Sequence, residues 1–93
     1  MDQKLNQKII IESLAMDLKR IALGLHRNSF AMANRFKEEA FKRARELESQ
    51  NPSDYLKKLL SYMKKMIQGS DDRVAEDALM LSTLFQNFAL KNF

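Results

Sequence analysis

The chain has 93 residues, which suit one domain because a sequence this short can enclose only one hydrophobic core. Hydrophobic residues make up 45% and charged residues 30% of the chain, a balance that excludes both intrinsic disorder and a membrane protein. Two glycines, one proline and no cysteine favour helices and exclude a disulfide framework, a thiolate zinc site and a cysteine nucleophile. We therefore expect a single all-α domain over residues 1–93.

The N-terminal segment predicts neither export nor insertion into a membrane. Glu12 interrupts the apolar run of Ile9, Ile10 and Ile11, so the segment lacks both a signal-peptide core and a span of about 20 apolar residues. The absence of cysteine agrees with a cytoplasmic location, which we expect. The net charge of +4 is uneven, because residues 51–68 carry +3 and residues 69–93 carry −2. This asymmetry is compatible with an anionic partner and with ion pairing within or between chains.

Residues 4–25 are predicted to form a helix with two apolar faces. One face has the 3-4 spacing of a helix packed on a core, with Ile11, Leu14, Leu18, Ile21 and Leu25. The second face lies almost opposite and contains Leu5, Ile9, Met16 and Leu23. A domain of this size cannot enclose one helix on all sides, so the second face predicts association with another chain, most simply as a homodimer.

Three further helices are predicted, over residues 30–48, 52–68 and 71–91. Each has an apolar stripe at helical spacing, and the first two also have a charged opposite side. Asn51 is expected to cap the third helix with Pro52 at its first position, and Gly69 to end it in the left-handed conformation. Ser70 or Asp71 is then expected to cap the fourth helix.

The segment from residue 23 to residue 30 decides the architecture. Gly24 can end a helix and Asn28 or Ser29 can begin the next, which gives a four-helix up-down-up-down bundle. However, the apolar pattern keeps its helical phase through the segment, and Gly24 is expected on the outer face. The alternative is one long helix of residues 4–49 plus two shorter helices in an intertwined dimer. We expect the bundle, because helices of 11–20 residues are the usual length.

One end of the predicted bundle gathers polar residues from three helices. The chain reversal places the start of the fourth helix near the turn after the first, which groups His26, Arg27 and Arg35 with Glu76 and Asp77. This candidate polar site could bind a small anion or an acidic peptide. Ion pairing between an acidic helix start and a basic turn is the simpler interpretation.

The third helix carries a basic outer side with Lys57, Lys58, Lys64 and Lys65. These lysines could contact nucleic-acid phosphates, although no helix-turn-helix, zinc or RNA-binding motif accompanies them. A solvated helix face is the simpler interpretation.

No motif for catalysis is present, since the sequence has no nucleophile paired with a base, no glycine-rich phosphate loop and no metal-ligand spacing. We expect no enzyme activity, no metal and no cofactor. The sequence predicts a small helical protein-interaction or scaffolding module that acts as a homo-oligomer, and another protein partner is compatible with the same face. The alternative is a basic nucleic-acid-associated protein.

Overall fold

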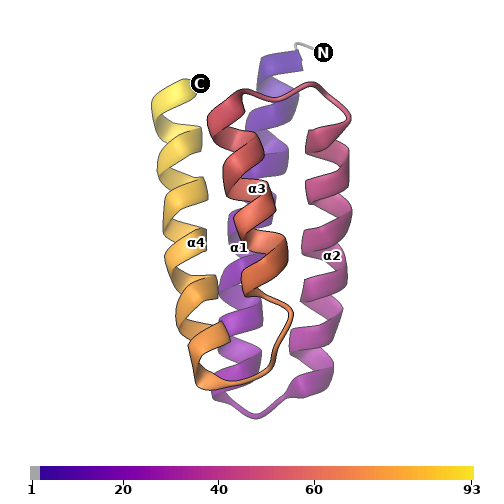
Figure 1. Cartoon of the computed structure of the whole chain (residues 1–93), viewed down its shortest axis with the longest axis vertical. Coiled ribbons are helices and arrows are strands. Elements are labelled where there is room, and N and C mark those ends of the chain that lie inside the picture. Colours follow the sequence, from indigo (N-terminus) through magenta and orange to yellow (C-terminus); the bar gives the residue numbers. More distant parts are fainter. Residues whose placement is uncertain (1–2) are drawn as a thin grey trace.

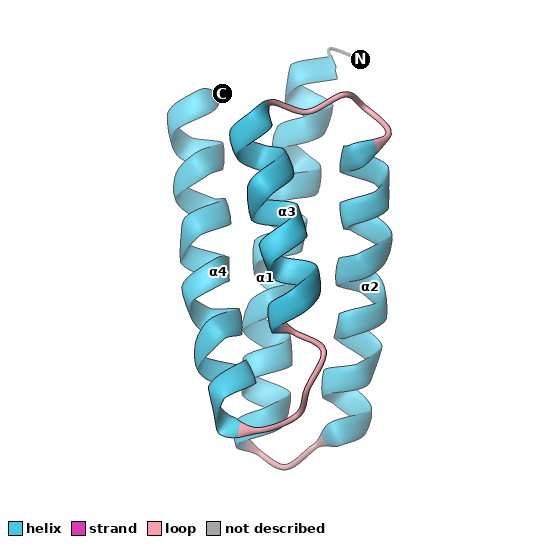
Figure 2. Cartoon of the chain, viewed as in Figure 1, coloured by secondary structure: helices cyan, strands magenta, loops and turns pink. Residues whose placement is uncertain are grey.

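Four helices run alternately up and down in the computed structural model, which describes residues 3–93 and the side chains from residue 5 onward (Figures 1 and 2). They are α1 (Gln3–His26), α2 (Phe30–Glu48), α3 (Asp54–Met66) and α4 (Asp72–Asn92). The predicted up-down-up-down bundle is confirmed. In the described part of the chain, no helix is long and apolar enough to span a membrane.

The helices are arranged so that α1 and α3 occupy diagonal corners. α1 packs against α2 and α4, α3 packs against the same two helices, and α1 and α3 make no close approach within residues 3–93. The outer sides of α1 and α3 therefore face opposite directions. A single buried cluster holds the four helices together, and it contains the whole predicted core face of α1, namely Ile11, Leu14, Leu18, Ile21 and Leu25.

The chain turns after α1, so the long-helix alternative is wrong. Asn28 adopts a left-handed conformation with φ of 56°, which asparagine tolerates better than most residues. The amide of Ser29 donates to the carbonyl of Gly24 at 2.7 Å and that of Asn28 donates to Leu25 at 3.1 Å. This pair of bonds is the Schellman pattern that closes a helix C-terminus, with Asn28 in the position usually held by glycine.

The helical phase predicted Gly24 on the outer face of α1, and this prediction is wrong. Gly24 is buried where α1 faces α2. A Cβ atom added at Gly24 would lie 2.9 Å from the backbone nitrogen of Ala33 and 3.2 Å from the carbonyl oxygen of Ser29. Glycine is required here because the two backbones approach too closely for a side chain. Gly24 therefore fixes the spacing of α1 and α2 just before the turn.

The termini of α3 differ from the prediction. Ser53 is the N-terminal cap, since its hydroxyl oxygen accepts from the amide of Leu56 at 3.3 Å, and Pro52 precedes the helix. Asn51 has a left-handed φ of 54°, so it forms part of the turn and caps no helix. The helix ends at Met66, and Gly69 does not adopt a positive φ. The predicted cap of α4 is confirmed, because Asp71 Oδ1 accepts from the amide of Val74 at 3.1 Å.

Candidate functional site

The second apolar face of α1 is about half exposed in the folded chain. We call it the α1 stripe, and its members Leu5, Ile9, Met16 and Leu23 are 50%, 47%, 47% and 40% exposed. In contrast, the core residues of the same helix are buried. The α1 stripe is therefore an apolar surface of the folded chain that lies outside the buried core.

Residues of α4 border the α1 stripe and enlarge the apolar surface. α4 runs antiparallel beside α1, and the Ser82 hydroxyl donates to the carbonyl oxygen of Ala15 at 2.8 Å, which sets the two helices in register (Figure 1). With this register, Leu79 lies toward the Leu23 end of the stripe and Leu90 toward the Leu5 end. Leu79 is 43% and Leu90 is 70% exposed. The exposed face of α1 and α4 is a candidate interaction surface, because large apolar side chains gather along it.

A groove of about 100 Å³ lies between α1 and α4 at the middle of this surface. Its lining contains Ala15 and Met16 from α1 and Gln86 from α4, with Glu12 and Lys19 among the other residues. Binding sites for small molecules are usually about 300–1,000 Å³. The groove is therefore of a size to receive a side chain rather than a cofactor.

The predicted polar site remains a prediction. His26, Arg27, Arg35 and Glu76 are exposed and Asp77 is half-buried. Among the described side chains, no hydrogen bond or ion pair joins any two of these five residues. Arg35 instead lies over the ring of Phe36, with its guanidinium carbon 5.8 Å from the ring centroid. The fold places these residues toward one end of the bundle, and binding of an anion or an acidic peptide there stays a prediction.

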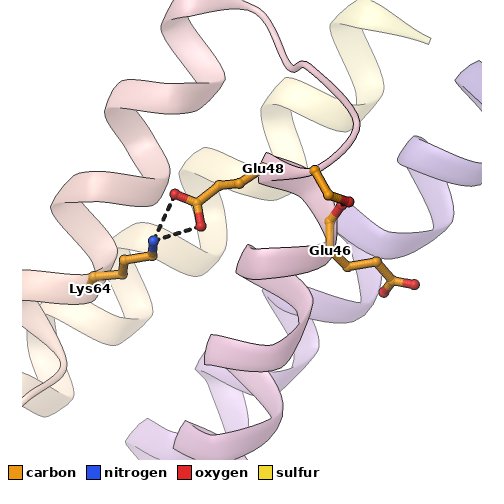
Figure 3. A network of polar contacts seen from close by, with 4 residues as sticks. Glu46, Glu48 and Lys64 are labelled. Carbon is orange, nitrogen blue, oxygen red and sulfur yellow. Dashed lines mark hydrogen bonds and ion pairs between the residues drawn. The ribbon is translucent and has the colours of Figure 1, made fainter.

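The α3 lysines separate into two groups. Lys64 Nζ donates to both carboxylate oxygens of Glu48, at 2.6 and 2.7 Å, and so links α3 to the end of α2 (Figure 3). Lys57, Lys58 and Lys65 are exposed. Tyr62 is 61% exposed and lines a shallow hollow with Lys58 and Lys65. Three of the four predicted lysines therefore form an accessible basic surface, on the side of the bundle away from the α1 stripe.

A buried charge cluster between α1 and α2 was not predicted. Asp17 is only 3% exposed, and its Oδ2 lies 3.4 Å from Arg43 Nε, while Arg43 also binds Glu39 at 3.1 Å. Burial raises the pKa of the Asp17 carboxyl above its ordinary value, and the Arg43 guanidinium partly opposes that rise. The burial of Asp17 could have been inferred from its spacing, because it follows the core residue Leu14 by three positions and precedes the core residue Ile21 by four.

A second buried charge, Lys37, was also missed. Lys37 is 8% exposed, and its Nζ donates to the carbonyl oxygen of Gly69 in the connection between α3 and α4. Burial lowers the pKa of Lys37. Its position continues the 4-3 spacing of Ala33, Ala40 and Ala44, which are all buried, and this regularity could have revealed it. Both buried charges bind neighbouring elements and so are suited to fixing the bundle geometry.

No metal site is visible in the part of the chain that the structure describes, where no three His, Cys, Asp or Glu side chains are grouped to hold an ion. The class that the fold and the surface define is a four-helix bundle with one exposed apolar face. Comparison with protein-family models, with curated protein sequences and with solved structures finds no match to this chain.

Proposed function

We propose that this protein is a non-catalytic helical interaction or scaffolding module that associates with a second copy of itself through the α1 stripe. The observation that supports this proposal is the line of four large apolar side chains, each 40–50% exposed, along one side of α1. Leaving such a line in water is unfavourable by about 25 cal/mol for each Å² of apolar surface, so covering it favours association. Exposed apolar patches of this kind are typical of protein-protein interfaces.

The dimension of the molecule also supports a partner of similar size. The Cα positions extend over 39 × 21 × 20 Å. The area of one long side is therefore comparable with the roughly 800 Å² that each partner contributes to a standard interface. The α1 stripe covers about two thirds of the 39 Å length of that side, since residues 5 to 23 span about 27 Å of helix.

Replacing Met16 and Leu23 together by glutamate is expected to raise the dimer dissociation constant about a hundredfold, because both carboxylates would have to be desolvated in the interface. The measurement is solution mass by sedimentation equilibrium at micromolar concentration. Helix content should not change, because both side chains are exposed in the single chain. The control is Met80→Glu with Tyr62→Glu, which places the same charges on exposed apolar positions off the α1 stripe. A monomeric wild-type chain, or an unchanged dimer in the Met16 and Leu23 variant, would contradict the proposal.

Nucleic-acid binding through α3 is the second candidate function, and the exposed group of Lys57, Lys58 and Lys65 beside Tyr62 favours it. Phosphate contacts make binding weaken with salt, with a slope of log K against log salt of about −0.9 for each contact on duplex DNA. Lys58→Ala with Lys65→Ala is expected to reduce that slope by about 2 if the lysines bind phosphates. Absence of any binding to DNA or RNA at about 50 mM salt would remove this function.

A further inference from the structure

Two charged residues of α1 lie beside the α1 stripe, at positions related to that of Met16. Glu12 lies four residues before Met16 and Lys19 lies three residues after it, and both side chains are exposed. Ile9 and Leu23 lie seven residues before and after Met16. Two apolar residues of the stripe therefore lie at equal distances from Met16, and two opposite charges beside the stripe lie at nearly equal distances from it.

We propose that the second copy docks with its α1 antiparallel to this one, about a two-fold axis that passes close to Met16. Resting on the proposed self-association, this arrangement sets Ile9 against Leu23 of the second copy. It also brings Glu12 toward Lys19 of the second copy, and the two-fold axis repeats that pair once. A parallel arrangement would instead set Glu12 against Glu12 and Lys19 against Lys19. Opposite charges across an interface select its register and orientation, and like charges oppose it, so the stripe favours the antiparallel arrangement.

The groove between α1 and α4 provides a place for the central side chain. Its lining includes Glu12 on one side of Met16 and Lys19 on the other, so it lies where the two-fold axis would pass. Its volume of about 100 Å³ suits one side chain. We assign Met16 of the second copy to it, because methionine is unbranched and adapts to irregular spaces. Gln86 and Ser82 of α4 line the same groove, so α4 takes part in the interface.

Charge reversal tests the arrangement. Glu12→Lys and Lys19→Glu are each expected to raise the dimer dissociation constant about tenfold at low salt, because each creates two like-charge contacts across the axis. The double variant, Glu12→Lys with Lys19→Glu, is expected to return the constant to within about threefold of wild type, since the opposite charges face each other again. The controls are Glu38→Lys and Lys57→Glu, which change the net charge equally on exposed positions of α2 and α3 and should leave dimerisation unaltered.

Cross-linking provides a second measurement, because the chain has no cysteine of its own. An equimolar mixture of Ile9→Cys and Leu23→Cys chains is expected to give a mixed disulfide dimer under oxidising conditions, whereas neither chain alone should cross-link. A Met16→Cys chain should cross-link to itself near the axis. Homodimers from Ile9→Cys and Leu23→Cys alone would indicate a parallel interface.

The outcomes distinguish the two proposals. If the wild-type chain is dimeric and the Met16 and Leu23 glutamate variant is monomeric, self-association through the stripe holds. In that case, failure of the double charge reversal to restore dimerisation, or parallel cross-links, would overturn the antiparallel arrangement alone. A monomeric wild-type chain would overturn both. Circular dichroism of every variant establishes that lost association does not result from lost folding.

Discussion

Replacing Arg43 by alanine is expected to lower the free energy of unfolding by about 2–3 kcal/mol at neutral pH, because it leaves the Asp17 carboxylate buried without its cation. Asp17 is almost fully buried, and its Oδ2 accepts no hydrogen bond that would replace the ion pair. The Arg43 side chain is 30% exposed, so water screens part of the interaction, and we expect a loss at or below the lower end of the roughly 3–5 kcal/mol that breaking a buried pair costs. Urea unfolding followed by circular dichroism measures the change.

The loss of unfolding free energy in the Arg43→Ala chain should depend on pH, in a direction set by the raised pKa of Asp17. A carboxyl with a higher pKa in the folded chain than in the unfolded chain binds its proton more tightly when folded. Its contribution to stability is therefore greatest when it is protonated and falls as the pH rises through the folded-state pKa. Without Arg43, which lowers that pKa, the value rises further. The Arg43→Ala chain should thus approach wild-type stability as the pH falls toward protonation of Asp17.

Two other variants separate the ion pair from general effects of losing an arginine. Arg45→Ala changes an exposed residue of the same helix and should alter stability by less than about 0.5 kcal/mol. Asp17→Asn together with Arg43→Ala removes the unpaired charge and should recover most of the loss at neutral pH. A loss in Arg43→Ala that is equal at low and neutral pH, and is not recovered by Asp17→Asn, would contradict this account of the cluster.

Replacing Phe85 by alanine is expected to cost about 3–5 kcal/mol, the largest effect of any substitution considered for this chain. Phe85 is fully buried in the centre of α4, and its removal leaves a cavity that the surrounding side chains fill only in part. A domain of this length has a total stability of roughly 5–14 kcal/mol. The Phe85→Ala chain should therefore melt about 15–30 °C below wild type.

The matched control is Met80→Ala on the same helix, where the side chain is 45% exposed. This substitution should lower the free energy of unfolding by less than about 1 kcal/mol, because little apolar surface is lost from the core. Both variants are compared with wild type at one fixed protein concentration, since association raises the melting temperature. Equal losses in the two variants would show that α4 does not contact the core through Phe85.

The periodicity of apolar residues was sufficient to predict the four helices and the core face of α1. Each apolar stripe repeats at 3–4 residues over several turns, and no other regular structure satisfies that spacing. The same periodicity separated the α1 stripe from the core, and its four residues are exposed in the folded chain. Helix termini were less accurate, because Ser53, Asn51 and Gly69 are all acceptable in several positions of a turn.

The turn after α1 could not be settled by helical phase. A three-residue connection can return the chain in register with its former pattern, so unbroken phase does not require an unbroken helix. The left-handed conformation of Asn28 and the close approach of Gly24 to Ala33 exist only once α2 folds back on α1. The polar end of the bundle followed the predicted topology, but no hydrogen bond or ion pair among the described side chains joins its five predicted residues, and Arg35 lies over the ring of Phe36.

The sequence by itself determined which residues form helices, which face of each helix is apolar and that α1 has one apolar face more than its own domain needs. These properties follow from local spacing, which does not depend on the arrangement of the helices. Only the tertiary structure decided that Asp17 is paired with Arg43, that Lys37 donates to the carbonyl oxygen of Gly69, that Lys64 is bound to Glu48, and that a groove beside Met16 lies between Glu12 and Lys19. Each of these results depends on which neighbouring helix or turn covers a given side chain, and that arrangement is set by packing between residues far apart in the chain.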